Sequence, residues 1–432
     1  MASGSSDMPD MKGSPELSCW TDDDRWQQML KEVAVFPGVL TFMELCAGLG
    51  TLGIVLDMLL GHRAKCVGQY DTDRRLQWAA SGPHQHYGVS GDLLKFGQAE
   101  ISAMPFCHVV AAGPPCPPWS ALGNRDSFDD ERSVVFWTCI DIVIHQAKFG
   151  KLLFFVLENV KGITEKTAGD PCAPSDMIME TLKKGLGHGW SIELMHLNTI
   201  NYGLPHRRPR VYMVGRRMRA YPLGPPSPIL PFVGRVPLRA LIDMTDNAPK
   251  TYTDKQKENI KDYKNAFRAF MVNPKYLGQF AIVDASRTPG ARTKWRGSKP
   301  TVDVCECLTA SGPALHVFSV GEGMGSPASV FGHRPLKIDR PMRISERAAL
   351  QGFPSEVAKA VDENVGKLAF GNAMSVPVLG TVIARELGTM LQGLGADAVM
   401  TLLRLPDMSE ADAHEHVIVN TGGPAIPVMS GI

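Results

Sequence analysis

Residues 39–53 read VLTFMELCAGLGTLG, and this stretch decides the fold. Residues 39–45 form a short apolar run, which is typical of a buried parallel strand. Glycines then stand at positions 48, 50 and 53, where they permit a tight turn close to a bound nucleotide. Apolar residues follow at helical spacing, at Leu52, Val55, Leu56 and Leu59. The stretch therefore predicts a strand, a glycine turn and a helix.

The same alternation continues along the chain. Apolar runs at 64–70, 108–112 and 152–157 predict further strands, and helix-like stretches separate them. Near the C-terminal end, apolar residues between positions 379 and 391 fit one face of a helix. Alternating strands and helices predict an α/β fold with a doubly wound, Rossmann-like sheet.

A cluster of prolines between Pro222 and Pro237 interrupts this pattern and predicts a domain boundary. A smaller inserted domain would follow it, and the regular pattern returns near Arg340. We expect a partly disordered N-terminal extension (1–37), a first part of the main domain (38–215), the inserted domain (216–339), a closing part of the main domain (340–392) and a C-terminal tail (393–432).

The composition excludes several classes of protein. The chain has 432 residues, of which 44% are apolar and 21% charged, as in a soluble globular protein. We find no apolar run of about 18 residues and no apolar core of a secretory signal, so we expect no membrane association. Nine scattered cysteines, with one close pair at Cys305 and Cys307, indicate free thiols and no metal site. We expect an intracellular protein, nuclear if its source is a eukaryote.

The net charge of the chain is +1, but basic residues are concentrated in one block. Residues 216–300 hold 17 Lys and Arg against 6 Asp and Glu. Such a block is a candidate binding surface for a polyanion, although a solvated basic surface would look the same in sequence.

The glycine turn predicts a nucleotide-binding site. Gly48, Gly50 and Gly53 form a GxGxxG pattern at the start of a helix, whose N-terminal N–H groups would face the ligand. Asp71 ends the next predicted strand, where a carboxylate can hold ribose hydroxyls, and Asp92 ends a third. By itself the pattern also fits a nicotinamide-dependent oxidoreductase, so it leaves the cofactor open.

A second segment carries a candidate nucleophile. Residues 113–120 read GPPCPPWS and directly follow the apolar run at 108–112. Prolines on both sides of Cys116 fix φ and stiffen the loop that presents its thiol. A thiol on a rigid loop at the carboxyl end of a strand is well placed for nucleophilic chemistry. Burial in the core, the alternative for any cysteine, suits Cys46, Cys66, Cys107 and Cys139 better.

Two further segments end in polar groups. Residues 155–160, FVLENV, close an apolar strand with Glu158, which can exchange protons if burial raises its pKa. Residues 203–215, GLPHRRPRVYMVG, place Arg208 and Arg210 on one face of a strand. Guanidinium groups suit base edges and phosphates. Taken alone, each segment would be read as a solvated acid or as surface arginines.

Together and in this order, these segments resemble the C5-cytosine DNA methyltransferase family. The cofactor motif of that family is similar to residues 44–53, its Pro-Cys loop to Pro115 and Cys116, and its Glu-Asn-Val to residues 158–160. Its Gln-x-Arg-x-Arg motif is similar to residues 206–210 and its Leu-Gln-Gly-Phe-Pro to residues 350–354. Its closing Gly-Asn-Ala is similar to residues 371–373, and residues 129–136 resemble the segment between the cysteine loop and Glu-Asn-Val. The basic block falls where the family carries its target-recognition domain.

The resemblance implies S-adenosylmethionine as the methyl donor. The residues expected to bind it are Glu44, Leu45, Cys46, Ala47, Gly48, Gly50, Asp71, Asp92, Leu93, Pro115, Asn372 and Ala373. It also implies that Cys116 adds to C6 of a flipped-out cytosine, that Glu158 bonds the base, and that Arg208 and Arg210 hold the base and the catalytic loop. We expect a monomer that acts on DNA.

Three residues depart from the family pattern. Cys46 stands where the family has a Phe that packs on adenine, Pro117 follows the Pro-Cys pair in place of Gln, and His206 replaces the first Gln of the arginine motif. One branch of the family methylates tRNA and carries Cys-Phe-Thr, which Cys307-Leu308-Thr309 partly matches. Methylation of tRNA is therefore the alternative function. A binding module without turnover is the non-enzymatic alternative, and the intact Cys116, Glu158 and Arg210 argue against it.

Overall fold

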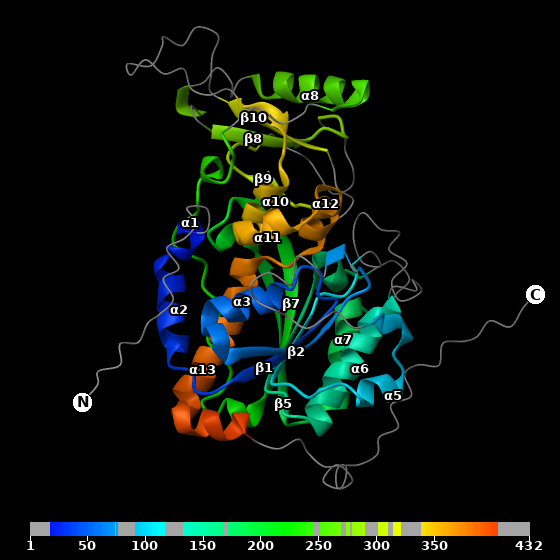
Figure 1. Ribbon diagram of the computed structural model, residues 1–432, viewed down its shortest axis with the longest axis vertical. Helices are drawn as coiled ribbons and strands as arrows, with labels where there is room; N and C mark the ends of the chain where they lie inside the picture. Colours follow the sequence, from blue (N-terminus) through cyan, green and yellow to red (C-terminus); the bar gives the residue numbers. More distant parts are fainter. Residues whose placement is uncertain are drawn as a thin grey trace, which may run out of the picture.

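The largest feature of the computed structural model is a six-stranded sheet with the strand order β2-β1-β3-β4-β7-β5 (Figure 1). Its strands are β1 (Leu40–Leu45), β2 (Ala64–Tyr70), β3 (Val109–Ala112), β4 (Phe154–Val160), β5 (Trp190–Asn198) and β7 (Pro209–Arg217). The first four strands are parallel, and β7 runs antiparallel to both β4 and β5. The structure describes residues 18–73, 75–76, 91–116, 133–166, 172–244, 251–268, 274–276, 279–289, 301–309, 314–320 and 338–404.

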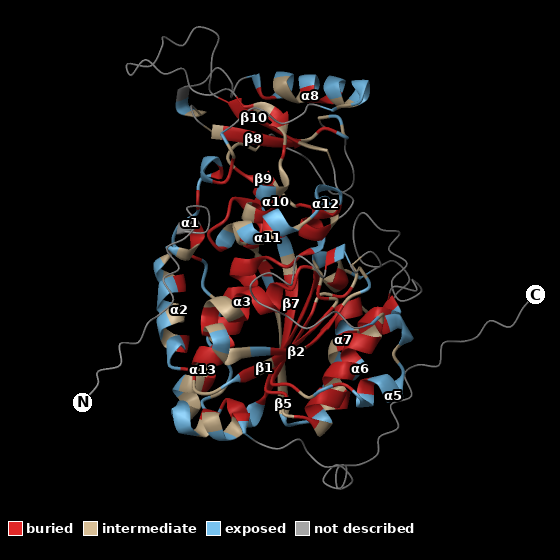
Figure 2. Ribbon diagram, in the orientation of Figure 1, coloured by how far each residue is buried: buried red, intermediate tan, exposed pale blue. Residues whose placement is uncertain are grey.

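Helices cover both faces of this sheet, which confirms the predicted doubly wound α/β fold (Figure 1). One face carries α2 (Asp24–Ala34), α3 (Thr51–Leu60) and α13 (Val376–Leu403), and the other carries α5 (Gln98–Ser102), α6 (Ser133–Phe149) and α7 (Pro174–Leu186). Successive side chains of a strand point to opposite faces. In β4, Phe154 and Val156 therefore join the first core cluster, whereas Phe155 and Leu157 join the second. Figure 2 shows the strands as the most deeply buried part of the molecule.

A smaller sheet lies at the opposite end of the molecule from β5 and α5 (Figure 1). It consists of β8 (Gln279–Asp284), β10 (Leu315–Val320) and β11 (Asp339–Pro341), which are antiparallel in the order β11-β10-β8. Helix α8 (Asp254–Ala266) begins at the Thr253 capping box and lies beside this sheet with a largely exposed surface (Figure 2). A separate small core, including Phe267 and Phe318, stabilises this part.

Short elements connect the two parts. β6 (His206–Arg207) pairs in parallel with β9 (Cys305–Glu306), so a strand next to the main sheet is bonded to a segment of the predicted inserted domain. Helices α10 (Ile344–Leu350), α11 (Ser355–Ala360) and α12 (Glu363–Asn372) lie between the two sheets (Figure 1). A short helix, α1 (Ser18–Thr21), precedes α2. The predicted domain boundaries stay predictions.

Both ends of the described chain pack on the main sheet more extensively than the sequence patterns indicate. Trp26 of α2 is 1% exposed, although it lies in the predicted N-terminal extension (1–37). Helical structure continues past residue 392 to Leu403, with a kink at Gly395 (φ 73°). The Leu403 carbonyl lies 3.2 Å from Nε2 of His108, the residue that precedes β3. Residues 1–17 and 405–432, and residues 129–132 of the family-like segment, lie outside the described residues.

The basic block needs one correction. Arg216 and Arg217 belong to the buried end of β7 and are 1% and 8% exposed. Arg216 binds the Glu386 and Glu193 carboxylates, because a charge in the core requires an ionic partner. These two arginines therefore cannot contribute to a surface that binds a polyanion. Lys250, Arg292, Lys294, Arg296 and Lys299 of the block lie outside the described residues.

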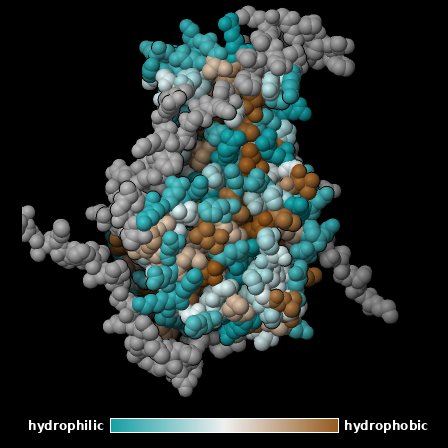
Figure 3. Space-filling model, turned by 180° about the vertical axis from the view of Figure 1, so that it is seen from behind, coloured by the Kyte–Doolittle hydropathy of each residue, from teal (hydrophilic) through white to brown (hydrophobic). Residues whose placement is uncertain are grey.

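The surface is mixed in polarity. On the face seen in Figure 3, hydrophobic residues form separate patches between hydrophilic ones, and the end that carries α8 is mostly hydrophilic. In the part of the chain that the structure describes, no single helix is long and apolar enough to span a membrane, although α12 and α13 pass that test as a pair bent by 44°.

Candidate active site

Three segments that carry the candidate catalytic residues meet at one edge of the main sheet. In the strand register, Leu45 of β1 lies beside Ala112 of β3, and Ala112 lies beside Leu157 of β4. The segments that follow these strands therefore leave the sheet at the same level. Because β7 runs in the opposite direction, it begins at this edge, and its Arg210 pairs with Val160. Residues far apart in the sequence are thus brought together by strand register.

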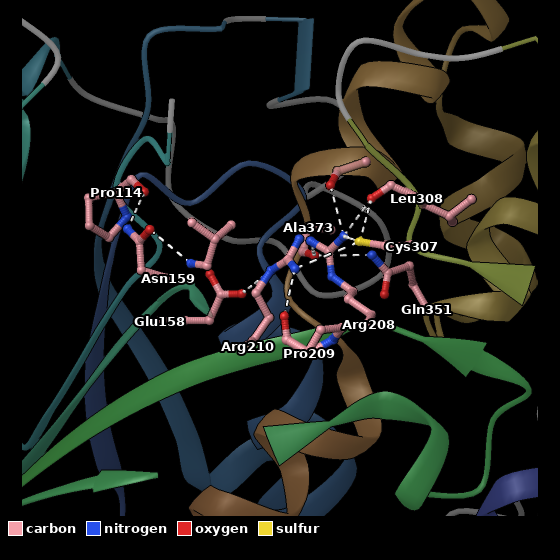
Figure 4. Close-up of polar contacts among 12 residues, drawn as sticks. Pro114, Glu158, Asn159, Arg208, Pro209, Arg210, Cys307, Leu308, Gln351 and Ala373 are labelled. Carbon is pink, nitrogen blue, oxygen red and sulfur yellow. Dashed lines mark hydrogen bonds and ion pairs between the residues drawn. The ribbon is translucent and has the colours of Figure 1, made fainter. Parts of the chain in front are cut away.

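Glu158 and Arg210 form an ion pair at this edge (Figure 4). Nε of Arg210 lies 3.0 Å from Oε1 of Glu158, and both side chains are largely buried, at 12% and 8% exposed. Burial raises the pKa of Glu158, and the charges of Arg210 and Arg208 partly offset that rise. The carboxyl group is therefore poised to exchange a proton or to accept a hydrogen bond.

The cysteine loop is attached to the same strand end by Asn159. Nδ2 of Asn159 donates to the Pro114 carbonyl at 3.2 Å, and its Oδ1 accepts from the Val160 N–H at 2.9 Å (Figure 4). The loop carrying Cys116 is thereby fixed beside Glu158. Burial raises the pKa of Cys116, whereas Arg210 and Arg208 lower it and Glu158 raises it further. The thiol is only partly buried. Residues 117–120 of the loop lie outside the described residues.

Arg208 lies deeper than Arg210 and contacts the main chain of other segments. Its guanidinium donates to the carbonyls of Leu308 at 2.8 Å, Gly371 at 3.1 Å and Ala373 at 2.7 Å (Figure 4). The residue is 2% exposed. These bonds make Arg208 a positioning residue that joins β7, the segment after β9 and the end of α12, while Arg210 contacts Glu158.

His206 is buried between two backbone segments. Its Nδ1 lies 3.0 Å from the Leu350 carbonyl, and its Nε2 accepts from the Leu308 N–H at 3.1 Å. This pair of partners defines the tautomer, in which Nδ1 carries the proton and donates to Leu350. Burial, together with Arg208 and Arg210, holds the pKa of His206 well below its usual range, so the ring is neutral.

The buried side chain of Glu44 stabilises the glycine turn that follows β1 by a hydrogen bond. Oε1 of Glu44 accepts from the Leu52 N–H at 2.9 Å, near the start of α3, and the side chain is completely buried. Burial raises the pKa of Glu44 to about 7, against the opposing effect of its hydrogen bonds. Cys46, Gly48 and Gly50 have φ values of 52°, 53° and 73°. Such backbone angles favour glycine, and they permit the tight turn between β1 and α3.

Of the two candidate ribose-binding carboxylates, Asp71 directly follows β2, whereas the residues before Gly91 and Asp92, 77–90, lie outside the described residues. Oδ2 of Asp71 accepts from the Gly48 N–H at 2.8 Å, which attaches the turn to the end of β2. Asp92 caps the short helix over residues 93–95 by accepting from the Leu94 N–H at 3.1 Å. Cys46 packs on the core cluster that contains Cys139. Hydrogen bonding to Cys139 and burial raise the pKa of the Cys46 thiol well above its usual range.

The remaining predicted cofactor residues have several environments. Leu45, Ala47 and Leu93 are buried, Pro115 is partly buried and Asn372 is exposed at the end of α12. The Ala47 N–H donates to the Tyr70 carbonyl, so this residue also joins β1 to β2. The Ala373 carbonyl accepts from Arg208 and from Gln351, at 2.7 and 3.1 Å.

Three residues of the site are absent from the sequence prediction. Asn159 fixes the cysteine loop, Gln351 joins α10 to the end of α12, and Leu308 is bonded by both His206 and Arg208. The Glu-Asn-Val and Leu-Gln-Gly-Phe-Pro motifs signal the first two. Leu308 lies in the Cys307-Leu308-Thr309 match, but that match does not indicate its role, because the role depends on contacts made by its backbone.

Comparison with known proteins agrees with this arrangement. The family model described as C-5 cytosine-specific DNA methylase matches residues 40–388. The type II methyltransferase M.HpaII of Haemophilus parainfluenzae is 26% identical over 369 residues, which cover 81% of this chain and 90% of that protein. The type II methyltransferase M.BsuFI of Bacillus subtilis is 31% identical over 212 residues, which cover 47% of this chain and 46% of M.BsuFI. The latter match thus spans less than half of M.BsuFI.

The fold has solved counterparts as well. The structure of the Entamoeba histolytica methyltransferase EhMeth aligns with a TM-score of 0.53 and 15% identity, over 82% of this chain and 98% of that one. At that identity the likeness establishes the shared fold. The family match, in contrast, extends through the segments that hold Cys116, Glu158 and Arg210. The chain therefore belongs to the C-5 cytosine-specific DNA methylase family of methyltransferases.

Proposed function

We propose that this protein transfers a methyl group from S-adenosylmethionine to C5 of a flipped-out cytosine in DNA, with Cys116 as the nucleophile. The observation that supports this most strongly is the buried Arg210–Glu158 pair, at 3.0 Å, beside the loop that carries Cys116. Addition to a pyrimidine ring requires a nucleophile, a carboxyl group that can carry a proton and a fixed cation. Cys116, Glu158 with its raised pKa, and Arg210 would supply these groups at one sheet edge.

Cytosine C5 is a weak nucleophile, so the ring must first be activated. The Cys116 thiolate would add to C6, which makes C5 electron-rich, and Glu158 would hold N3 and the exocyclic amine. Arg210 would stabilise the developing negative charge near O2 and keep Glu158 in place. After methylation, loss of the C5 proton and departure of Cys116 would restore the aromatic ring.

The turn after β1 fits a nucleoside cofactor. The Gly48 position has a φ of 53°, and a Cβ built there meets no atom within 4 Å, so the backbone has open space beside it. Asp71 supplies a carboxylate next to this turn, and Oε2 of Glu44 has no hydrogen-bond partner among the described residues. When bound, S-adenosylmethionine supplies an electrophilic methyl group on a sulfonium. Carboxylates suit the hydroxyls and the positive charge of this cofactor.

DNA is the substrate we propose because several similar curated proteins are type II methyltransferases, among them M.HpaII and M.BsuFI. A base inside a duplex must leave the stack, at a cost of a few kcal/mol. Contacts of basic residues with phosphates would offset that cost. We propose an intracellular location for this activity.

The test is transfer of tritiated methyl from S-adenosylmethionine to duplex DNA and to total tRNA in parallel, with Cys116→Ala as the control. We expect label on DNA that is lost in Cys116→Ala, while binding of S-adenosylmethionine by that variant, measured by calorimetry, is retained. Label on tRNA alone would replace DNA by RNA as the substrate. Full activity of Cys116→Ala would contradict the role of this residue.

A further inference from the structure

Three alternate residues, from β6 to the start of β7, all contact one short segment of the predicted inserted domain. His206 belongs to β6, Arg208 lies between β6 and β7, and Arg210 is the second residue of β7. These three residues are buried or half-buried, whereas the residues between them are exposed. The Leu308 N–H donates to Nε2 of His206 at 3.1 Å, and the Leu308 carbonyl accepts from Nη1 of Arg208 at 2.8 Å. Both polar backbone groups of this buried residue are therefore held by side chains of the catalytic edge.

The neighbouring residue extends these contacts to the catalytic pair. Sγ of Cys307 lies 3.8 Å from Nη1 of Arg208 and 3.7 Å from Nη1 of Arg210 (Figure 4). Arg210 in turn lies 3.0 Å from Glu158. An unbroken series of contacts thus runs from the backbone that follows β9 to the carboxyl group proposed to hold the base.

His206 connects this series to a third segment. Its other ring nitrogen donates to the Leu350 carbonyl, at the end of α10. A histidine in the neutral state supplies one donor and one acceptor, which match these two backbone partners. A side chain without both functions would leave a buried N–H or carbonyl unpaired, which is destabilising.

We propose that the Cys307–Leu308 segment transmits the position of the inserted domain to Arg210, through the Leu308 backbone and the Cys307 thiol, and that His206 is the positioning residue that holds this segment in place. The consequence for catalysis rests on the function proposed above for Arg210 and Glu158. While the inserted domain keeps its Leu308 contacts with His206 and Arg208, Arg210 stays paired with Glu158. When the Leu308 contacts are lost, Arg210 leaves its position beside Glu158.

A release of Arg210 has a measurable signature at Cys116. Arg210 and Arg208 lower the pKa of this thiol, and Glu158 raises it. Loss of the arginines from their places would therefore raise the pKa of Cys116 and reduce the fraction of reactive thiolate. This signature requires no methyl transfer.

The test compares His206→Leu, which removes both polar contacts, with His206→Gln, whose amide keeps one donor and one acceptor. Alkylation of Cys116 by iodoacetamide is followed by peptide mass spectrometry from pH 6 to 10 in the full-length protein. We expect His206→Leu to slow alkylation at about pH 8 by roughly threefold to tenfold, because a tenfold loss of thiolate corresponds to one pKa unit. We expect His206→Gln to stay within about twofold of the wild type.

Turnover is measured on the same proteins. We expect kcat on the methyl acceptor to fall in His206→Leu and recover in His206→Gln, with the Kd for S-adenosylmethionine unchanged in both. Should His206→Leu fail to fold, Cys307→Ala removes the thiol contacts to both guanidiniums and should also slow alkylation of Cys116.

The two measurements distinguish a failure of the proposed coupling from a failure of the proposed function. Identical alkylation profiles for the wild type and a folded His206→Leu, or for the wild type and Cys307→Ala, would refute the coupling even if the wild type is an active methyltransferase. A shifted profile in a protein that methylates neither DNA nor tRNA would support the coupling and refute the proposed function.

Discussion

At the scale of single residues, burial and two arginines have opposite effects on the pKa values of the site residues. Burial raises the pKa of both Cys116 and Glu158, and the charges of Arg210 and Arg208 lower them. The proposed mechanism requires opposite protonation states of the two groups, because in it Cys116 ionises and the carboxyl group carries a proton. An ion pair between Arg210 and Glu158 places the cation where it acts on both.

We predict that Glu158→Gln lowers kcat by about 10²-fold or more, because an amide cannot donate the proton that stabilises the activated base. Affinity for DNA should change little, since the ion pair is buried and does not face phosphates. Single-turnover methylation and fluorescence anisotropy measure the two quantities. Glu180→Gln, on the exposed side of α7, is the matched control. An unchanged rate in Glu158→Gln would remove this residue from the mechanism.

His108 predicts a pH dependence of stability. Its Nδ1 accepts from the Thr41 N–H at 2.9 Å and its Nε2 lies 3.2 Å from the Leu403 carbonyl, so the ring is held in a neutral form. Burial lowers the pKa of His108 to about 4 from 6.5. The unfolded chain therefore binds a proton at higher pH than the folded one. The stabilising contribution is complete above pH 6.5 and is lost as the pH falls toward 4, by about 3 kcal/mol.

Urea unfolding between pH 4 and 7 measures this effect, with His108→Gln as the comparison. The wild type should lose stability more steeply than the variant as the pH falls, because the variant has no titrating ring at this position. Parallel pH profiles for the two proteins would show that His108 does not titrate on unfolding in this range.

At the scale of elements, strand packing limits which residues the main sheet accepts. Gly215 of β7 pairs with Phe155 of β4 in the register, and a Cβ built on it would lie 2.0 Å from Cε1 of Phe155. The aromatic ring occupies the space that a side chain would need. β7 therefore depends on glycine at this position for its contact with the strand that carries Glu158.

We predict that Gly215→Ala destabilises the protein by about 1–3 kcal/mol, because the added methyl group forces Phe155 or the strand to shift. The free energy of unfolding in urea is the measurement. Gly189→Ala serves as the control, since a Cβ there meets no atom within 4 Å. Equal stabilities for the two variants would contradict the close packing of β4 and β7.

The sequence predicted the elements better than it predicted their contacts. Apolar runs and glycine spacing indicate β1 to β4 and the turn after β1, because each of these signals is local. They do not show that Arg208 bonds the carbonyls of Leu308, Gly371 and Ala373, which lie at least 100 residues away in the chain. They also do not distinguish the buried Arg216 and Arg217 from surface arginines, since burial depends on the register of β7.

At the scale of the whole molecule, two bodies meet at buried polar contacts. His206 and Arg208 hold the segment after β9, and the Arg340 guanidinium binds the Glu346 carboxylate of α10 at 2.6 Å. Buried charges and hydrogen bonds of this kind depend on a defined geometry. The smaller sheet is thus held in a defined position relative to the edge of the main sheet that carries Glu158 and Arg210, and the proposed function requires such a position of a domain that binds DNA.

We predict that affinity for duplex DNA falls steeply with salt, because binding would release counterions from phosphates contacted by basic residues. Fluorescence anisotropy between about 50 and 200 mM NaCl measures the slope, which increases with the number of phosphates contacted. Binding that does not change over this range would argue against a phosphate-based surface on this protein.

Covalent trapping on duplex DNA that contains 5-fluorocytosine, in the presence of S-adenosylmethionine, shows directly whether Cys116 adds to the base. In cytosine, loss of the C5 proton allows the nucleophile at C6 to depart. Fluorine at C5 cannot be removed by a base in this way, so a nucleophile that has added to C6 stays attached to the methylated base. We predict a complex that survives denaturant, with the DNA attached to Cys116 in the peptide mass spectrum and no complex formed by Cys116→Ala. Attachment at another cysteine, or methyl transfer to ordinary DNA without any trapped complex on the fluorinated duplex, would contradict the account.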